Sequence, residues 1–181
     1  MFGITITIAA VEGRNEQFKK IISYQTSFTN AGLPVISIDT KKKELLGNFS
    51  RSDTAYFTSE THAYDHDFLS SADGQIVPHG IFDVNENIGY LTHYFNRNTS
   101  EFICDNLSKC WTETLQYKYS DAETMLLLCN GGGSNASAHY IVKQDIAKLA
   151  KSLNILVAHY PPYCSKWNPI EYRLFSQISH T

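Results

Sequence analysis

Three short apolar runs, separated by stretches with helical spacing, constrain the fold of this chain most. The runs cover residues 33–39, 125–129 and 155–159, and aliphatic side chains dominate them. Runs of this length suit buried strands better than helices. Because apolar residues recur at helical intervals between the runs, the order of elements predicts a mixed α/β sheet with helices packed on its faces.

Helices are predicted where the apolar spacing is helical. The first covers residues 16–30 and is closed by Ala31-Gly32, since glycine favours the left-handed conformation that ends many helices. Two more are expected over residues 99–118 and 136–153. Residues 44–76 show no clear pattern, so we expect an irregular or short-stranded segment there.

Two strand-like runs, residues 77–84 and 88–95, flank a short turn-forming segment and predict a hairpin. The apolar start of the chain, residues 1–11, is shorter than a membrane span and lacks the positive charge of a signal peptide. We interpret it as a strand or a frayed start. Without an internal repeat or a linker, residues 1–181 are expected to form one domain with no membrane-spanning segment.

Composition narrows the functional class. With 181 residues, 43% of them apolar and 13% aromatic, the chain can bury a sizeable core. The net charge of −3 does not indicate a nucleic-acid binder, so any affinity for DNA has to come from local basic clusters. The cysteines form no CxxC or zinc-ligand spacing, and we expect them to stay reduced in the cytoplasm. They are Cys104, Cys110, Cys129 and Cys164.

Polar residues at the strand ends point to chemistry. Asp39 and Asn130 follow two predicted strands, and Glu171 lies on the first turn of a helix after the third, behind an Asn168 N-cap and Pro169. Acids at all three positions would hold two Mg²⁺ ions, which serve phosphodiester chemistry. Spacing alone also allows a capping box, in which Glu171 reaches back to the N–H of Asn168.

A second interpretation of the same region is a phosphate loop. Three glycines, Gly131 to Gly133, follow the strand that ends at Asn130. However, no Gly-Lys-Ser/Thr follows them and the chain has no GxGxxG, so an unrelated nucleotide-binding domain is the weakest of the functional hypotheses.

Five blocks along the chain form an ordered set of motifs. The first covers residues 34–49, and two more follow at His66-Asp67-Phe68 and at residues 78–84. The last two are Gly131 to Asn135 and residues 159–176, which contain Lys-Trp-Asn-Pro-Ile-Glu. In this order the blocks resemble the Rhodopirellula-type insertion-sequence transposases over residues 15–181. The resemblance implies a ribonuclease H-like DDE domain that cuts and rejoins transposon DNA with Mg²⁺ or Mn²⁺.

The resemblance assigns the metal-binding catalytic triad to Asp39, Asn130 and Glu171. The middle residue departs from the family pattern, which has Asp before the triple glycine. An amide can offer one carbonyl oxygen to a metal ion but no negative charge, so we predict weakened metal binding and severely reduced or absent strand cleavage. Asp83 is a candidate for a supplementary ligand, although an Asp in a turn is the simpler interpretation. Two other acids, Asp121 and Glu123, are expected to point elsewhere.

Other departures concern the surroundings of the site and the ends of the chain. Tyr163-Cys164 replaces a small and a hydroxyl residue, and Tyr172 replaces a His that the family has after the Glu. The chain begins near the catalytic core and stops ten residues after Glu171 (181 − 171 = 10). We therefore expect a core truncated at both ends, a fragment or decayed copy without the DNA-binding domain that the family has upstream.

The candidates for DNA contact are basic and aromatic. Lysines would bind phosphates, although a solvated surface is the simpler interpretation of a lysine run. Trp167 would stack on a base or pack under the last helix. The implied partners are transposon ends and target DNA, and homo-oligomerisation stays open. The candidates are Lys41, Lys42, Lys43, Lys166 and Trp167.

Two functional hypotheses therefore stand beside each other. The first is a transposase catalytic domain impaired at Asn130. The second is a non-catalytic transposase remnant that binds DNA or a partner protein.

Overall fold

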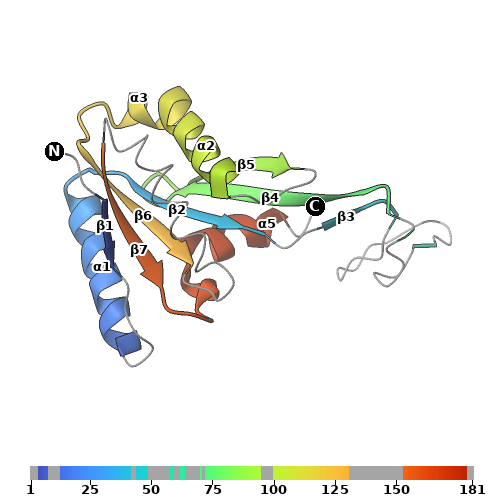
Figure 1. The fold of residues 1–181 in the computed structure, drawn as a ribbon, viewed down its shortest axis with the longest axis horizontal. Helices are drawn as coiled ribbons and strands as arrows, with labels where there is room; N and C mark the ends of the chain where they lie inside the picture. Colours follow the sequence, from blue (N-terminus) through green and yellow to red (C-terminus); the bar gives the residue numbers. More distant parts are fainter. Residues whose placement is uncertain are drawn as a thin grey trace.

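The computed structural model describes residues 4–7, 13–41, 44–48, 58, 62–63, 70, 72–94, 100–130 and 153–178. Their backbone forms a mixed sheet with helices on both faces, as Figure 1 shows. The strand order is β1-β7-β6-β2-β4-β3, with β5 paired to β4. The strands are β1 (Ile4–Thr7), β2 (Val35–Thr40), β3 (Glu44–Leu46), β4 (Gly74–Asp83), β5 (Ile88–Tyr94), β6 (Thr124–Asn130) and β7 (Asn154–Tyr160).

The four strands at one side of the sheet are parallel to one another. β1 pairs with β7, β7 with β6 and β6 with β2, all in parallel, while β4 runs antiparallel to β2, β3 and β5. The apolar start of the chain is thus a strand, and the three central apolar runs are the strands that the sequence predicts. Figure 1 shows β3 and the start of β4 extending away from the rest of the sheet.

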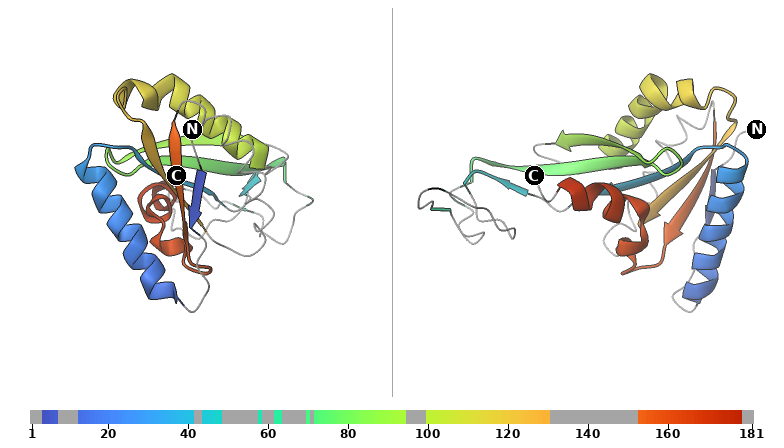
Figure 2. Two further views of the ribbon diagram at one scale, coloured as in Figure 1. Left: turned by 60° about the vertical axis from the view of Figure 1, so that its left-hand side comes forward. Right: turned by 180° about the vertical axis from the view of Figure 1, so that it is seen from behind.

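Alternation along the strands divides the core between two faces. Ile36, Ile81, Leu127 and Ile155 belong to one buried cluster with residues of α2 (Ser100–Cys110), the helix that covers this face. The residues that alternate with them along the strands pack on the other face, against α1 (Arg14–Asn30) or the last helix (residues 169–178). Figure 2 shows α2 on one side of the sheet and the last helix on the other. The period of two therefore builds two separate cores from the same strands.

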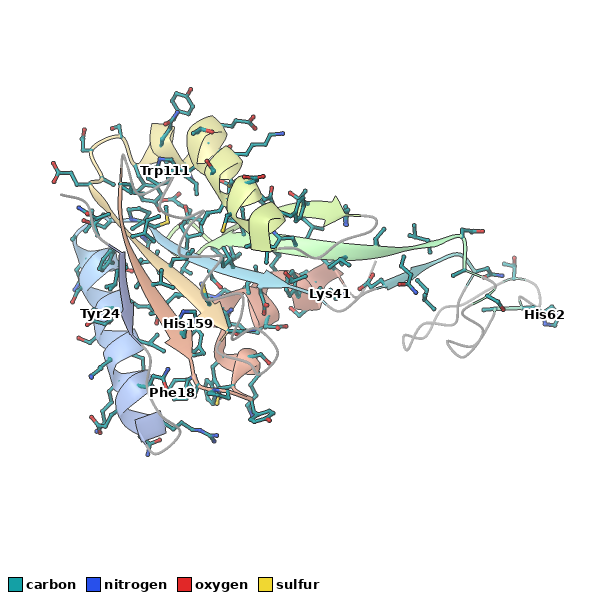
Figure 3. All side chains as sticks on the ribbon, viewed as in Figure 1. Phe18, Tyr24, Lys41, His62, Trp111 and His159 are labelled. Atoms are coloured by element: carbon teal, nitrogen blue, oxygen red, sulfur yellow. The ribbon has the colours of Figure 1, made fainter. Side chains whose placement is uncertain are left out.

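Helix α1 ends where the sequence predicts. Gly32 follows it with a φ of +67°, and its N–H donates to Thr29 O over 3.0 Å, which satisfies a carbonyl that the last turn leaves open. On the sheet side, Gln17 Nε2 donates to His159 O over 2.5 Å, and Phe18 lies 6.0 Å from the Tyr160 ring. Figure 3 shows Phe18 and Tyr24 along this helix.

The predicted hairpin joins β4 and β5. Asp83 accepts the backbone N–H groups of Asn85 and Glu86 over 3.1 and 3.2 Å, and Asn87 takes the left-handed conformation with a φ of 58°. Short polar side chains suit both positions, because they bond to nearby backbone and tolerate positive φ. The turn chemistry thus explains why the strands reverse here.

The helix predicted over 99–118 is present with one irregular turn. α2 continues into a π-helical turn, η3 (Trp111–Leu115), and ends in α3 (Gln116–Lys118). Trp111, labelled in Figure 3, and Leu115 are buried against the sheet. The helix predicted over 136–153 lies outside the described residues, apart from Leu153.

Two further observations concern membranes and cysteines. In the described part of the chain, no helix is long and apolar enough to cross a bilayer. Within the same residues, the four cysteines are free thiols.

Candidate active site

Alternation along β2 decides which of its side chains face the last helix. Ile36 and Ile38 belong to the core beneath α2, so Ser37 and Asp39 point to the opposite face. Asn130 is the last residue of β6 and has the same orientation, because the alternate residues of that strand belong to the α2 core. The polar residues at both strand ends therefore share one face of the sheet.

The register of β2 and β6 places Asp39 beside Asn130. Val35 pairs with Leu126, an offset of 91 residues, and the same 91 residues separate Asp39 from Asn130. The Asn130 Nδ2 donates a hydrogen bond to Asp39 Oδ2. The parallel pairing thus brings together two residues that are distant in the sequence.

The last helix, defined here as residues 169–178, carries Glu171. A single 3₁₀ turn, η5 (Ser165–Trp167), precedes it. The helix contains a π-helical turn, η6 (Glu171–Phe175), and ends in α5 (Ser176–Ile178). The predicted helix is confirmed, with an irregular turn that begins at the candidate site residue.

Two glycines let this helix lie directly on the sheet. A Cβ on Gly80 would lie 2.7 Å from Ile170 Cδ1 and 2.8 Å from Phe175 Cε1, and one on Gly89 would lie 2.5 Å from Leu174 Cδ1. Distances of this size are far inside van der Waals contact. A larger residue at either glycine would push the helix away from β4 and β5, and with it the carboxyl group on the first turn.

This close approach brings Glu171 to Asp39. Burial, and after it the hydrogen bond and the charge of the Glu171 carboxyl, raise the pKa of Asp39 to about 8. The N–H of Thr40 donates to Asp39 Oδ1 over 2.8 Å and acts in the opposite direction, as does the Asn130 amide. Asp39 is therefore harder to ionise than a solvent-exposed carboxyl group.

Asn168 connects the start of the helix to both strand ends. It is fully buried, and its Oδ1 accepts a hydrogen bond from Ser37 Oγ over 2.5 Å. Its Nδ2 donates to Ile38 O over 3.4 Å and to Asn130 Oδ1 over 3.2 Å. The side chain predicted to cap a helix is thus the centre of a buried polar network.

The alternative of a capping box does not describe this helix start. The N–H of Asn168 donates to Ser165 O over 2.8 Å, while Glu171 is bonded to Asp39. The reason is that the ends of β2 and β6 lie beside the helix start, where Asp39 is a partner for the Glu171 carboxyl group. Glu171 is therefore turned toward the sheet.

The donor set does not fit a pair of divalent cations. Within the described ranges, no group of three or more His, Cys, Asp or Glu side chains is arranged to hold a metal ion. The sequence suggested that Asn130 can offer its carbonyl oxygen, but the structure turns the nitrogen of the amide toward Asp39 and the oxygen toward Asn168. An amide nitrogen is not a ligand for Mg²⁺, which binds oxygen.

The other acids considered from the sequence lie elsewhere. Asp83 pairs with Ile36, toward the opposite end of β2 from Asp39, and its oxygens accept the turn N–H groups and the Tyr119 hydroxyl over 3.0 Å. Its role as a turn residue is therefore the correct one. Asp121 and Glu123 are exposed before the start of β6, at the far end of that strand from Asn130.

The lysine candidates behave differently from one another. Lys41, labelled in Figure 3 at the end of β2, forms an ion pair with Glu44, and only 18% of its side chain is exposed. Glu44 thus neutralises the Lys41 charge that was expected to contact a phosphate. Lys42 and Lys43 lie outside the described residues.

Lys166 and Trp167 are exposed together on η5. The Lys166 Nζ lies 5.8 Å from the centre of the Trp167 ring, which is 57% exposed. The indole meets Phe18 of α1 edge to face at 6.0 Å. The alternative that Trp167 packs under the last helix is therefore wrong, because the ring leans on α1 and leaves most of its surface open.

Three residues of the site escaped the sequence interpretation. Ser37 was counted among strand residues, although a polar residue inside an apolar run signals a specific partner. Asn168 was interpreted as a cap, and Gly80 as part of a motif. Only the close packing of the last helix gives the three their roles.

Solved structures support the fold. The chain resembles the Mos1 transposase paired-end complex with left transposon end, with 14% identity and a TM-score of 0.60 over 96% of this chain and 50% of that one. It also resembles the mariner Mos1 paired end complex with Mg, with 16% identity and a TM-score of 0.62 over 99% of this chain and 53% of that one. The Mos1 strand transfer complex matches with 16% identity and a TM-score of 0.61 over 97% of this chain and 52% of that one. The chain therefore spans about half the length of these proteins. The likeness confirms the predicted ribonuclease H-like fold.

Sequence comparison gives the family. No curated protein matches the chain closely enough to count as a relative. The family described as Rhodopirellula transposase DDE domain matches residues 5–181, nearly the whole sequence. The resemblance seen in the motif blocks is thus confirmed, and the chain belongs to the Rhodopirellula transposase DDE domain family.

Proposed function

We propose that this chain is a DDE transposase catalytic domain in which DNA strand cleavage and transfer are impaired by Asn130. The observation that carries the proposal is the hydrogen bond from the Asn130 amide to Asp39, at the strand end where the family has an acid. The substitution removes one negative charge from the site. We therefore expect the chain to be a pseudoenzyme or an enzyme with very low activity.

The proposed site consists of Asp39, Asn130 and Glu171. In an intact site, three acids would hold two divalent cations that serve phosphodiester chemistry. In this chain, Asp39 is hydrogen-bonded both to Glu171 and to the Asn130 amide. These residues can orient one another, but they cannot supply the charge that the chemistry needs.

The proposed partner is DNA, contacted by the exposed Lys166–Trp167 pair. A second cation–aromatic pair lies on the last helix, where the Arg173 guanidinium is 5.6 Å from the centre of the exposed Tyr172 ring. A cation beside an open aromatic ring can pair with a phosphate while the ring stacks on a base. Lys41 contributes less, because Glu44 neutralises it.

This surface also favours a second function, a non-catalytic transposase remnant that binds DNA or a partner transposase. The Lys166–Trp167 pair does not depend on Asn130 for its exposure, so binding can persist where cleavage is lost. Transposon ends and target DNA remain the proposed ligands, with a second copy of the chain as a further partner. We place this activity in the cytoplasm and assign it to one domain over residues 1–181.

A nicking assay tests the proposed impairment. Supercoiled plasmid is incubated with the natural chain and with Asn130→Asp in Mn²⁺, and open circles are measured. We expect no nicking by the natural chain above the level without protein, and nicking by the variant. The matched control is Asn130→Asp combined with Glu171→Gln, which should remove the gained activity. Nicking by the natural chain at the rate of Asn130→Asp would overturn the proposal.

Binding is tested separately by the anisotropy of a labelled DNA duplex with a single-stranded overhang. We expect Lys166→Ala to weaken binding and to lower the slope of log K against log salt by about 0.9, the value for one lost phosphate contact. Lys109→Ala is the control, because this exposed lysine lies on α2, on the other face of the sheet. Equal effects of the two variants would exclude the surface around Lys166.

A further inference from the structure

The polar network beside the candidate site has a direction, which begins at a backbone N–H. The N–H of Ile170 donates to Ser37 Oγ over 3.4 Å, and it can only donate. Ser37 must therefore use its single proton elsewhere, and it donates to Asn168 Oδ1. The Ser37 hydroxyl thus links the start of the helix to the oxygen end of the Asn168 amide.

The backbone carbonyl of Ile38 sets the orientation of the Asn168 amide. The carbonyl of Ile38 can only accept, and it receives Asn168 Nδ2 over 3.4 Å. The same nitrogen donates to Asn130 Oδ1 over 3.2 Å. Reversing the Asn168 amide would place two oxygens against each other at Ile38 and would leave both buried groups unsatisfied.

The orientation is then passed on to the candidate site. Since Asn130 Oδ1 is held by Asn168, the Nδ2 of Asn130 must face Asp39, where it donates to Oδ2. An acid at position 130 would accept from Asn168 equally well and would present its second oxygen to Asp39. Asn168 therefore makes an acid at position 130 present an oxygen to Asp39, whereas it makes an amide there present an N–H.

We propose that Asn168 is a positioning residue that holds the N–H₂ end of Asn130 against Asp39, so that the amide closes the site by hydrogen bonds and is not a weak metal ligand. The inference rests on the proposed function and deepens it, because it states why the substitution disables the site. The amide satisfies Asp39 in the way that a shared cation would satisfy a pair of acids.

The two roles of Asn130 predict different effects of its removal. Mn²⁺ affinity is measured by calorimetry on the full chain and on Asn130→Ala. If the amide were a ligand through its oxygen, truncation would lower the affinity. We expect no decrease, because the group removed is a donor that faces away from a cation. Asn130→Asp is the positive control and should raise the affinity by about tenfold or more, since charge count sets the affinity of oxygen sites. A decrease in Asn130→Ala would overturn the inference.

Asn168→Asp tests the positioning role. An acid at 168 would accept from Ser37 and would also accept the Nδ2 of Asn130, which would turn the Asn130 oxygen toward Asp39. We expect Mn²⁺ affinity to rise by about tenfold, a common effect of residues that orient a ligand. The gain should vanish in Asn168→Asp combined with Asn130→Ala. A gain that survives the truncation would come from the added charge alone and would contradict the inference, and so would no gain in a folded variant.

One measurement needs no substitution and stands if Asn168→Asp fails to fold. In the natural chain, the side-chain amide protons of Asn130 should exchange slowly with solvent and show scalar coupling across the hydrogen bond to the Asp39 carboxyl carbon. The half-buried Asn106 amide, which donates to His79 Nδ1 over 2.8 Å, serves as a reference. Rapid exchange at Asn130 without coupling would overturn the inference.

These outcomes separate the inference from the proposed function. A lower Mn²⁺ affinity of Asn130→Ala would show that Asn130 is a ligand and would end the inference, while the natural chain would still be inactive. Plasmid nicking by the natural chain at the rate of Asn130→Asp would end the proposed function, whatever the affinities.

Discussion

The two faces of the sheet use the same strands in opposite ways. Beneath α2, Ile36, Leu127 and Ile155 form a continuous apolar core. On the other face, near the last helix, Ser37 and Asp39 take the positions between the isoleucines and join the polar network. The first face depends on burying apolar area, and the second depends on giving every polar group a partner with the correct polarity.

This difference explains how the chain tolerates a polar cluster in its interior. A buried polar group costs little when its hydrogen bonds are complete and much more when one is missing. The apolar face can adapt to small changes by repacking, whereas on the polar face the exchange of one oxygen for a nitrogen turns an acceptor into a donor. Four predictions, from the largest effect to the smallest, test this contrast.

The apolar face should respond most strongly to truncation. Leu127→Ala removes a fully buried side chain from the α2 core, and we expect the free energy of unfolding to fall by about 4 kcal/mol, within the range for leucine truncations. Urea unfolding measures it. Tyr117→Ala, at a side chain that is 76% exposed, is the control and should change little. A Leu127→Ala cost as small as that of the control would contradict the description of this core.

The same face holds one polar group that titrates. Burial lowers the pKa of His79 from 6.5 to about 4, and within the described residues its Nε2 has no hydrogen-bond partner. Below pH 6.5 the unfolded chain binds a proton that the folded chain refuses, so stability should fall as the pH drops from 6.5 through 4, by about 3 kcal/mol in total.

The contribution of His79 is the difference between the natural chain and His79→Gln. Unfolding by urea at several pH values gives both curves, and the variant removes only this titration. We expect the natural chain to lose more stability than the variant between pH 7 and pH 4. Parallel curves would show that the histidine is not buried in the neutral form.

The face of the last helix should respond to a single methyl group. Gly80→Ala would place a Cβ within 2.7 Å of Ile170 Cδ1, and we expect a loss of about 2 kcal/mol from overpacking. In the Asn130→Asp background it should also weaken Mn²⁺ binding, because the helix carries Glu171. Gly13→Ala is the control, since a Cβ there meets nothing within 4 Å. If both variants behave alike, the helix does not depend on the glycine for its approach.

The smallest effect is expected from one hydroxyl of the network. Ser37→Ala removes the donor to Asn168 and the acceptor of the Ile170 N–H, and we expect a loss of about 1 kcal/mol. Ser176→Ala, which removes a bond to Tyr172 O at the surface, should cost less. Calorimetric melting compares the two. A neutral Ser37→Ala would show that the network is not tightly satisfied.

Much of the fold was predictable because hydrophobic spacing is a local property of the chain. The buried strands, the hairpin and α1 agree with their predicted positions to within one to three residues. The location of Asp39 and Asn130 at neighbouring strand ends followed from the rule that functional groups collect at the carboxyl ends of parallel strands. These predictions need only the residues within each element.

The detailed interpretation of the site was less successful. Of the two roles considered for Trp167, packing under the last helix is wrong, since the ring is 57% exposed, and Lys41 was considered for phosphates while Glu44 lies three residues away. Asn168 has the right residue type and backbone position for a helix cap, yet its side chain bonds to the sheet. In each case a local pattern had two uses, and the choice depended on what else lies near.

The sequence shows the class of fold, the family and an amide, Asn130, at the end of a strand. Which atom of that amide faces Asp39 depends on the tertiary structure, because the Ile38 carbonyl orients Asn168 and Asn168 holds the Asn130 oxygen. Ile38 lies 130 residues from Asn168 along the chain, and Ser37 lies 133 residues from Ile170, so these groups meet only when the last helix packs on β2. Hydrophobic spacing can be interpreted within one element, but the direction of a hydrogen bond depends on the donors and acceptors of the whole network.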